Sequence, residues 1–180
     1  MQQAQTTDST RGVTRGGLPG LTGGQHLTFL AAGETYAMSI ARIKEIIEYG
    51  QVTAIPLMPE FIRGVINLRG AVVPVIDLSA RLGFPPSRVQ AKTCVVIVEI
   101  DHEGQTFDMG LVVDGVSAVL DLGESDLEPP PNFGARIRSD FIQCMARING
   151  RFVIVMRIEQ VLSVEEVSEL ARLGHRESIA

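Results

Sequence analysis

The sequence contains no tryptophan, only two cysteines and only three histidines among its 180 residues. Cys94 and Cys144 lie in separate apolar stretches, and neither has a second thiol or a histidine at the spacing of a metal site. Because a free cysteine behaves as a small hydrophobic residue, we expect both to be reduced core residues. The sequence therefore predicts no metal ion and no other cofactor.

Long apolar runs and clusters of basic residues are also missing. No run approaches the roughly 18 apolar residues that a membrane-spanning helix needs, and the first residues lack the pattern of a secretory signal. The 16 Lys and Arg residues are outnumbered by 21 Asp and Glu residues, which gives a formal net charge of -5. Without a basic cluster to neutralise phosphates, a nucleic-acid partner is not expected. These patterns predict a cytoplasmic protein with no direct membrane insertion.

The sequence motifs of common catalytic sites are absent. It contains no nucleophile elbow, P-loop, dinucleotide-binding glycine pattern or zincin motif. Asp77, Asp114 and Asp121 each follow a strand-like run, where carboxylates commonly cap or end a turn. Nothing in the linear pattern brings two such groups to one substrate atom, so we expect structural roles for them and no enzyme activity.

Short runs of β-branched residues dominate what is present. Hydrophobic residues make up 45% of the chain but aromatic residues only 5%, and Val and Ile gather in runs of strand length. Turn signals separate these runs, at Gly33-Glu34, 102–104, Asp114-Gly115 and Asn149-Gly150, the last being the strongest hairpin signal. About ten short strands with tight turns indicate a barrel or sandwich, and no repeat period indicates a propeller or solenoid.

Three segments differ from this strand pattern. Within 39–50, four isoleucines recur at helical spacing between Ser39, a candidate N-cap, and Gly50, a candidate stop, so a short helix is predicted. The segment VLSVEEVSELARLG predicts a second helix near the C-terminus. Residues 1–24 are rich in glycine and threonine and are predicted to form a disordered tail.

The run GVINLRGAVVPVIDL, from Gly64 to Leu78, places an arginine in a turn framed by glycines. Arginine is enriched at the centres of protein interfaces, although a solvated turn arginine is the commoner case. Arg69 is therefore a candidate binding residue. Pro74, in the strand that follows, cannot donate to a ladder, so we expect it at a sheet edge or at a bulge.

The order of these motifs resembles that of the CheW family of bacterial coupling proteins. The resemblance rests on the segment from ETYAMS to SARLG, on GLVVDGVSAVLDL, on EPPP, and on FIQCMARINGRFVIVMRIEQVL, and it extends over roughly 26–162. It implies an all-β fold of two packed SH3-like five-stranded β-barrels with short connecting helices and a C-terminal helix. The barrels would occupy 25–164, and the C-terminal helix and tail 165–180.

The resemblance also implies a function. Such proteins are non-catalytic adaptors that couple the cytoplasmic tip of a chemoreceptor, a methyl-accepting chemotaxis protein, to the regulatory domain of a CheA-type histidine kinase. They are recruited to membrane-associated chemoreceptor clusters, where self-association in arrays is a further option. The receptor tip is expected in a groove between the barrels, and the residues implied are Ile40, Ile43, Glu45, Arg69, Gly110 and Val113.

The kinase domain is expected to pack end to end on the first barrel. The resemblance implies the loop after VTAIP, with Ile55, Pro59, Phe61 and Gly64. Two alternatives remain at this point. One is a paralogue of the same fold that serves a non-flagellar chemosensory pathway such as surface motility. The other is a small-ligand-binding β-barrel, which would need a cavity with convergent polar groups where these strands offer mostly Val and Ile.

Overall fold

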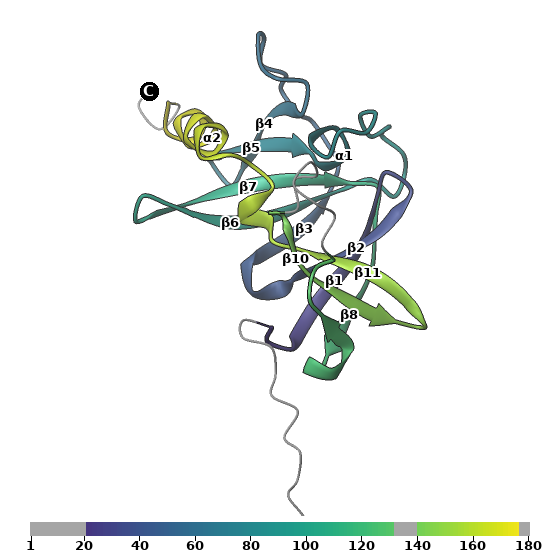
Figure 1. Cartoon of the computed structure of the whole chain (residues 1–180). Helices are drawn as coiled ribbons and strands as arrows, with labels where there is room; N and C mark the ends of the chain where they lie inside the picture. The colour runs from purple at the N-terminus through teal and green to yellow at the C-terminus, as the bar shows by residue number, and fades with distance from the viewer. Residues whose placement is uncertain (1–20, 132–139, 177–180) are drawn as a thin grey trace, which may run out of the picture.

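The computed structural model describes residues 21–131 and 140–176 (Figure 1). The strands are β1 Gly24–Ala31, β2 Glu34–Ser39, β3 Ile43–Glu48, β4 Ile62–Leu68, β5 Ala71–Asp77, β6 Cys94–His102, β7 Gln105–Val113, β8 Gly115–Leu122, β9 Leu127–Glu128, β10 Ile142–Ile148 and β11 Arg151–Met156. The α-helices are α1 Leu78–Arg81 and α2 Val164–Arg176, and the single 3₁₀ turns are η1 Ile40–Arg42, η2 Glu124–Asp126 and η3 Ile158–Gln160.

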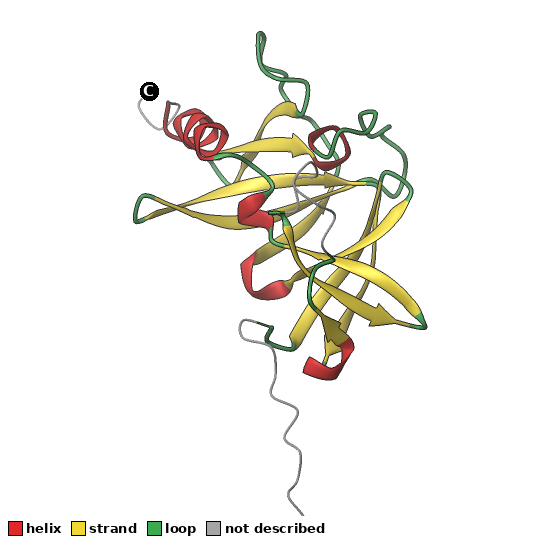
Figure 2. Ribbon diagram, viewed as in Figure 1, coloured by secondary structure: helices red, strands yellow, loops and turns green. Residues whose placement is uncertain are grey.

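The strands form two sheets, which are the two small barrels that the family resemblance implied (Figure 2). One, here the β1 barrel, has the strand order β8-β1-β2-β11-β10-β9, and the other, the β5 barrel, has the order β3-β6-β7-β5-β4. The two-residue strand β9 makes the first sheet six-stranded rather than five-stranded. Each barrel takes strands from both halves of the chain, so the two barrels are interleaved and neither is built from one continuous segment.

Four hairpins in the described part have two-residue turns in which both residues have positive φ. These turns are Ala32-Gly33, Arg69-Gly70, Glu103-Gly104 and Asn149-Gly150. Positive φ at both positions matches the type I′ turn, whose twist suits a hairpin. The first turn lies one residue before its predicted place, and Asn149-Gly150 is confirmed. Asp114 separates β7 from β8 as expected, but these strands belong to different barrels and form no hairpin.

The helix predicted within 39–50 is wrong. Only η1 is helical there, and the hydroxyl of Ser39 accepts the N–H of Ala41 at its start, so this residue does act as an N-cap. The next six residues form β3, in which half-buried and exposed positions alternate with the period of a strand. β3 pairs with β6 from Ile43 opposite Val98 to Glu48 opposite Cys94. Because isoleucine is β-branched and a partner strand is available, pairing prevails over the helical spacing of the isoleucines.

The hairpins β4–β5 and β10–β11 repeat one another, a relationship that the sequence analysis missed. Each has a register shift near the start of its first strand, and each has a second strand that pairs in parallel with a strand of the other half of the chain. The N–H of Asp77 donates to the Phe61 carbonyl (2.6 Å), and the N–H of Arg157 donates to the Phe141 carbonyl (2.7 Å). Few identical residues accompany this match, because a strand pair constrains burial and turn geometry more than residue identity.

Pro74 does not lie on an edge strand, contrary to one of the two expectations, because β5 lies between β7 and β4. It pairs with Val65, whose own N–H and carbonyl bond to Thr53 on the far side of β4. The ladder between β5 and β7 begins only at Val75, one residue later. The missing N–H of the proline is therefore required by neither neighbour. The register shift of β4 lies next to this pair, at Gly64.

One hydrophobic core joins both barrels and the C-terminal helix. Its fully buried members include Phe29 of the β1 barrel, Leu111 of the β5 barrel and Leu170 of α2. Two smaller clusters fill the insides of the barrels, one in each. The cysteines are free as expected, with Cys144 buried and Cys94 half-buried. Burial raises the pKa of both thiols.

The C-terminal helix is confirmed as α2, which begins at Val164. The predicted tail lies mostly outside the described residues, which begin at position 21. β1 begins at Gly24, the last residue assigned to that tail, and Leu21 packs against the core of the β1 barrel. None of the described helices is long and apolar enough to span a bilayer, and the described residues contain no group of three potential metal ligands.

Candidate docking surfaces

Arg69 and Glu45 form a two-bond ion pair across the β5 barrel. Arg69 Nη1 donates to Glu45 Oε1 at 2.7 Å, and Nη2 donates to Oε2 at 2.8 Å. Glu45 lies on β3 and Arg69 in the β4–β5 turn, so the pair connects the two opposite edges of the sheet. The Glu45 carboxylate raises the pKa of the guanidinium. The arginine side chain remains 76% exposed, against 25% for the glutamate, so its remaining N–H groups face solvent.

The turn holds Arg69 in a backbone conformation that suits glycine or asparagine better. Its φ is 51°, and left-handed φ disfavours a residue with a Cβ by about 1 kcal/mol. The side chain of Asn67 stabilises the turn by accepting the N–H of Gly70 at 2.9 Å. Ala32 and Glu103 adopt the same φ in their own turns, so this conformation alone assigns no role to the guanidinium of Arg69.

A shallow hollow of about 270 Å³ lies beside this pair. It is lined by Lys44, Glu45, Leu68, Arg69, Ile97 and Asp108. Lys44 Nζ donates to both oxygens of Asp108 at 3.0 and 3.1 Å and lies 3.6 Å from Glu99. Glu99 and Asp108 face each other across β6 and β7, so Lys44 offsets a repulsion between like charges. The resemblance did not point to Lys44 or Asp108, which come together only through strand pairing.

The other residues expected at the receptor surface differ in their exposure. Ile40 and Ile43 are half-buried and pack against the main core. Gly110 and Val113 are buried within β7, and a Cβ on Gly110 would lie 2.7 Å from Val95 Cγ1. These two therefore line no groove, because β7 is a central strand covered on both sides. Ile46, by contrast, is 41% exposed on β3.

The chain between β3 and β4, here the connector (49–61), projects beyond the end of the β5 barrel (Figure 1). It is tied to the barrel by two backbone bonds between Thr53 and Val65, at 2.9 and 3.0 Å. Leu57 is fully exposed in this segment and has a positive φ of 63°. Sequence reasoning missed Leu57, although an apolar pair between two prolines, in Pro56-Leu57-Met58-Pro59, was a signal for it.

The residues expected to meet the kinase divide between surface and support. Pro59 is exposed on the connector, and Ile55 is half-buried there. Gly64 does not lie in the loop but is buried in β4, where a Cβ would overlap the carbonyl of Thr53. Its part is to let the connector close against β4. Phe61 is half-buried, with the guanidinium carbon of Arg81 5.3 Å from its ring centroid.

The three aspartates considered as catalytic candidates do not converge. Asp77 is fully buried, and its carboxylate accepts bonds from Arg63 Nε (3.0 Å) and Nη2 (2.8 Å) and from the Ser87 N–H (2.8 Å). Asp114 accepts the N–H of Ala32, and Asp121 is exposed on β8. The first two have the structural roles expected of a carboxylate after a strand.

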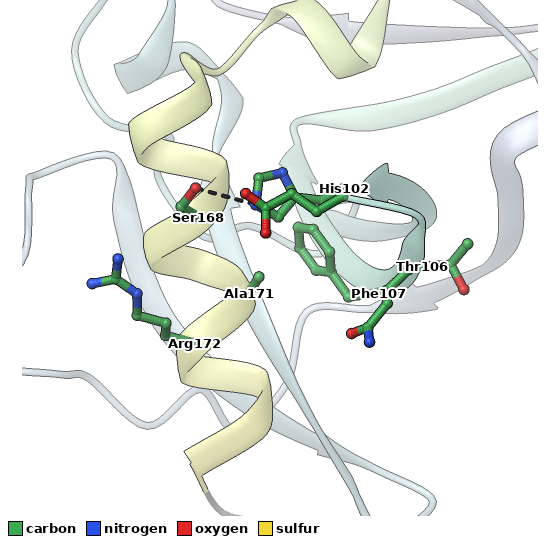
Figure 3. Close-up of a pocket in the computed structure, with 8 residues that line it drawn as sticks. His102, Thr106, Phe107, Ser168, Ala171 and Arg172 are labelled. Carbon is green, nitrogen blue, oxygen red and sulfur yellow. Dashed lines mark hydrogen bonds and ion pairs between the residues drawn. The ribbon is translucent and has the colours of Figure 1, made fainter.

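A pocket of about 320 Å³ separates the β6–β7 turn from α2 (Figure 3). Its polar atoms are not arranged around one ligand position. His102 Nε2 and Ser168 Oγ bond to each other at 3.1 Å, and the guanidinium of Arg172 is turned away from His102. A second pocket, of about 400 Å³, has the bonded hydroxyls of Ser79 and Ser87 on its wall. Neither arrangement favours the small-ligand alternative.

Comparison with known proteins gives a consistent result. The model of the CheW-like domain matches residues 25–166. The chain is 37% identical over 152 residues to the chemotaxis protein CheW of Klebsiella aerogenes, which covers 84% of this chain and 89% of that protein. It is 30% identical over 144 residues to the chemotaxis protein CheW of Bacillus subtilis, covering 80% and 90%. The crystal structure of the scaffolding protein TtCheW from Thermoanaerobacter tengcongensis superposes with a TM-score of 0.70 at 33% identity, covering 81% of this chain and 97% of that one.

Proposed function

The chain belongs to the CheW family, whose members are scaffolds that couple receptors to CheA in chemotaxis. We propose that this chain binds its two partners through two separate surfaces of its β5 barrel. One surface surrounds Arg69 and takes the cytoplasmic tip of a chemoreceptor. The other is the connector, which takes the regulatory domain of a CheA-type histidine kinase. The protein acts in the cytoplasm, is recruited to membrane-associated receptor clusters, and needs no catalytic group for this role.

The receptor surface combines an oriented cation with an apolar strand edge. Glu45 uses two of the guanidinium N–H groups of Arg69 and leaves the others free for a carbonyl or carboxylate of the partner. Ile46 follows Glu45 on β3 and is 41% exposed, with its side chain on the opposite face of the strand. A helical hairpin that lays an apolar face on this edge would be fixed in register by bonds to Arg69. Gly110 supports the surface from inside by leaving room for the side chains of Val95 and Val75.

The single observation that carries the kinase surface is the full exposure of Leu57 in a connector anchored at both ends. A leucine side chain gains about 1.5–3 kcal/mol when it moves from water into an apolar pocket, and Leu57 meets no such pocket among the described residues. Pro59 and Ile55 lie on the same connector and enlarge the apolar contact. Gly64 contributes indirectly, by holding the connector against β4.

The two surfaces lie at opposite ends of β4, so both partners can bind at once. The connector precedes Ile62 and the Arg69 turn follows Leu68, and seven strand residues span roughly 20 Å. Modest affinity at each surface is sufficient in a receptor cluster, where linked contacts raise the effective concentration.

The test is recruitment of the kinase regulatory domain to an immobilised receptor-tip fragment, measured with and without this protein. We expect recruitment only when the protein is present, and loss of recruitment with either Arg69→Glu or Leu57→Asp. Each variant should retain the partner of the surface that it leaves intact. A protein that binds neither partner, or variants that retain both, would contradict the proposal.

A further inference from the structure

Phe61, where the connector rejoins β4, is covered by an arginine that belongs to another part of the chain. Arg81 is the last residue of α1, and its guanidinium carbon lies 5.3 Å from the centroid of the Phe61 ring. This distance places the cation over the aromatic face, an attractive arrangement. Arg81 is 19% exposed, so the contact is shielded from solvent.

The C-terminal helix determines where Arg81 lies. Arg81 Nη2 donates to Glu166 Oε1 at 3.0 Å, and Glu166 is in the first turn of α2. The glutamate is itself fixed by a capping box, since its Oε1 accepts the Ser163 N–H at 2.9 Å and its own N–H donates to Ser163 Oγ at 3.2 Å. Leu170, fully buried, anchors the helix in the main core.

Phe61 in turn constrains the end of the connector. Its carbonyl accepts the N–H of Asp77 at 2.6 Å, and the next N–H, of Ile62, donates to the Pro59 carbonyl at 2.9 Å. The second bond closes a turn between Pro59 and the start of β4, and the first fixes the backbone of Phe61 against β5, so Phe61 lies at the point where the connector rejoins the barrel.

We infer that Arg81 is a positioning residue for kinase docking, through which α2 holds Phe61 and so orders the connector that presents Leu57. The inference rests on the function proposed above for the connector. Ordering the connector before the partner arrives lowers the entropy lost on binding and so strengthens it. The consequence is that a change in α2, about a hundred residues further along the chain, alters kinase affinity without contacting the kinase.

The chain provides a matched control for this arrangement. Arg147 lies 5.4 Å from the centroid of Phe152 and donates to Glu128 at 2.8 Å, the same three residue types at nearly the same distances. This trio is on the β1 barrel, and its arginine and glutamate are 60% and 45% exposed. It contacts no part of the connector, so its loss should leave kinase affinity unchanged.

The experiment measures the affinity of the full chain for the kinase regulatory domain by calorimetry, for wild type, Arg81→Met, Leu57→Ala, the double variant and the control Arg147→Met. Methionine keeps an apolar contact with Phe61 and removes the ion pair. We expect Arg81→Met to weaken binding about fivefold and Arg147→Met to change it less than twofold, with receptor-tip affinity unchanged in both.

The double variant distinguishes positioning from a general structural role. If Arg81 acts by presenting Leu57, its replacement should have much less effect once Leu57 is already alanine, whereas independent effects would add. Glu166→Gln, which preserves the capping box, provides a second variant for the same cycle should Arg81→Met fold poorly. Full additivity, or unchanged affinity in Arg81→Met and Glu166→Gln, would overturn the inference. Unchanged affinity in Leu57→Ala would instead overturn the proposed function of the connector.

Discussion

The guanidinium of Arg69 bonds to both carboxylate oxygens of Glu45 and so links the β4–β5 turn to β3 at the opposite edge of the same sheet. The pair is exposed, and exposed ion pairs contribute little to folding. Two parallel bonds do, however, fix the plane and direction of the guanidinium. Recognition and stability can therefore be separated at this residue.

Arg69→Asn should weaken receptor-tip binding while leaving the protein at least as stable. Asparagine tolerates the left-handed φ of this turn better than arginine, so the melting temperature should stay the same or rise slightly. Loss of the guanidinium should reduce receptor affinity about tenfold and leave kinase affinity unchanged. Glu103→Asn, at the same position of the β6–β7 turn, is the control and should affect neither. A large fall in melting temperature would make Arg69 a structural residue.

Leu57→Asn should likewise weaken binding at the connector without destabilising the protein. Leu57 is fully exposed with a φ of 63°, so asparagine should raise the free energy of unfolding by up to about 1 kcal/mol. Kinase-domain affinity should fall about tenfold, since an apolar anchor is lost. Val89→Asn, another exposed apolar loop residue of this barrel, serves as the control. Equal effects of the two variants in a binding titration would argue against a specific role for Leu57.

Gly64→Ala should destabilise the protein strongly. A Cβ at this position would overlap the Thr53 carbonyl, and the φ of 139° disfavours any residue other than glycine. We expect urea unfolding to show a loss of about 3 kcal/mol. Gly104 also has a positive φ, but a Cβ there would meet open space. Gly104→Ala should therefore lower the free energy of unfolding by only about 1 kcal/mol. Similar losses at both sites would mean that the connector moves aside easily.

Asp77→Asn should likewise reduce the free energy of unfolding, by about 3 kcal/mol. The carboxylate is fully buried and bonds to Arg63, and removing its charge leaves that guanidinium poorly compensated. Asp101→Asn removes an exposed partner of Arg42 and should change stability by less than about 1 kcal/mol. Chemical denaturation of both variants tests the contrast, and equal losses at Asp77 and Asp101 would contradict it.

The two cysteines should react slowly with thiol reagents. Burial raises the pKa of both thiols, so the reactive thiolate is scarcer at a given pH than in an unfolded chain, and alkylation should accelerate only at higher pH. Cys94 is half-buried and Cys144 is buried, so we expect Cys94 to be modified first. Mass spectrometry after timed alkylation would give the order, and a faster Cys144 would indicate local opening of β10.

The sequence correctly indicated the strands with clear turn signals. Asn149-Gly150 specifies its hairpin by local chemistry alone, because both residues accept positive φ readily. The prediction of a helix within 39–50 failed because the isoleucine spacing there is compatible with both a helix and a strand. The choice between them depended on pairing with β6, about fifty residues away. The edge placement of Pro74 failed for a similar reason, since edge or centre is a property of the whole sheet.

For the sites, the sequence by itself determined the family, and hence the scaffold function, and it singled out Glu45 and Arg69 as candidates. Only the tertiary structure decided that these two residues meet, that Gly110 and Val113 are buried, and that Leu57 is exposed while Arg81 covers Phe61. The order of the motifs can be read from the sequence because turns and strand runs depend on neighbouring residues. Contacts between β3 and the β4–β5 turn, or between α1 and α2, depend on how two interleaved barrels pack, which no local segment specifies.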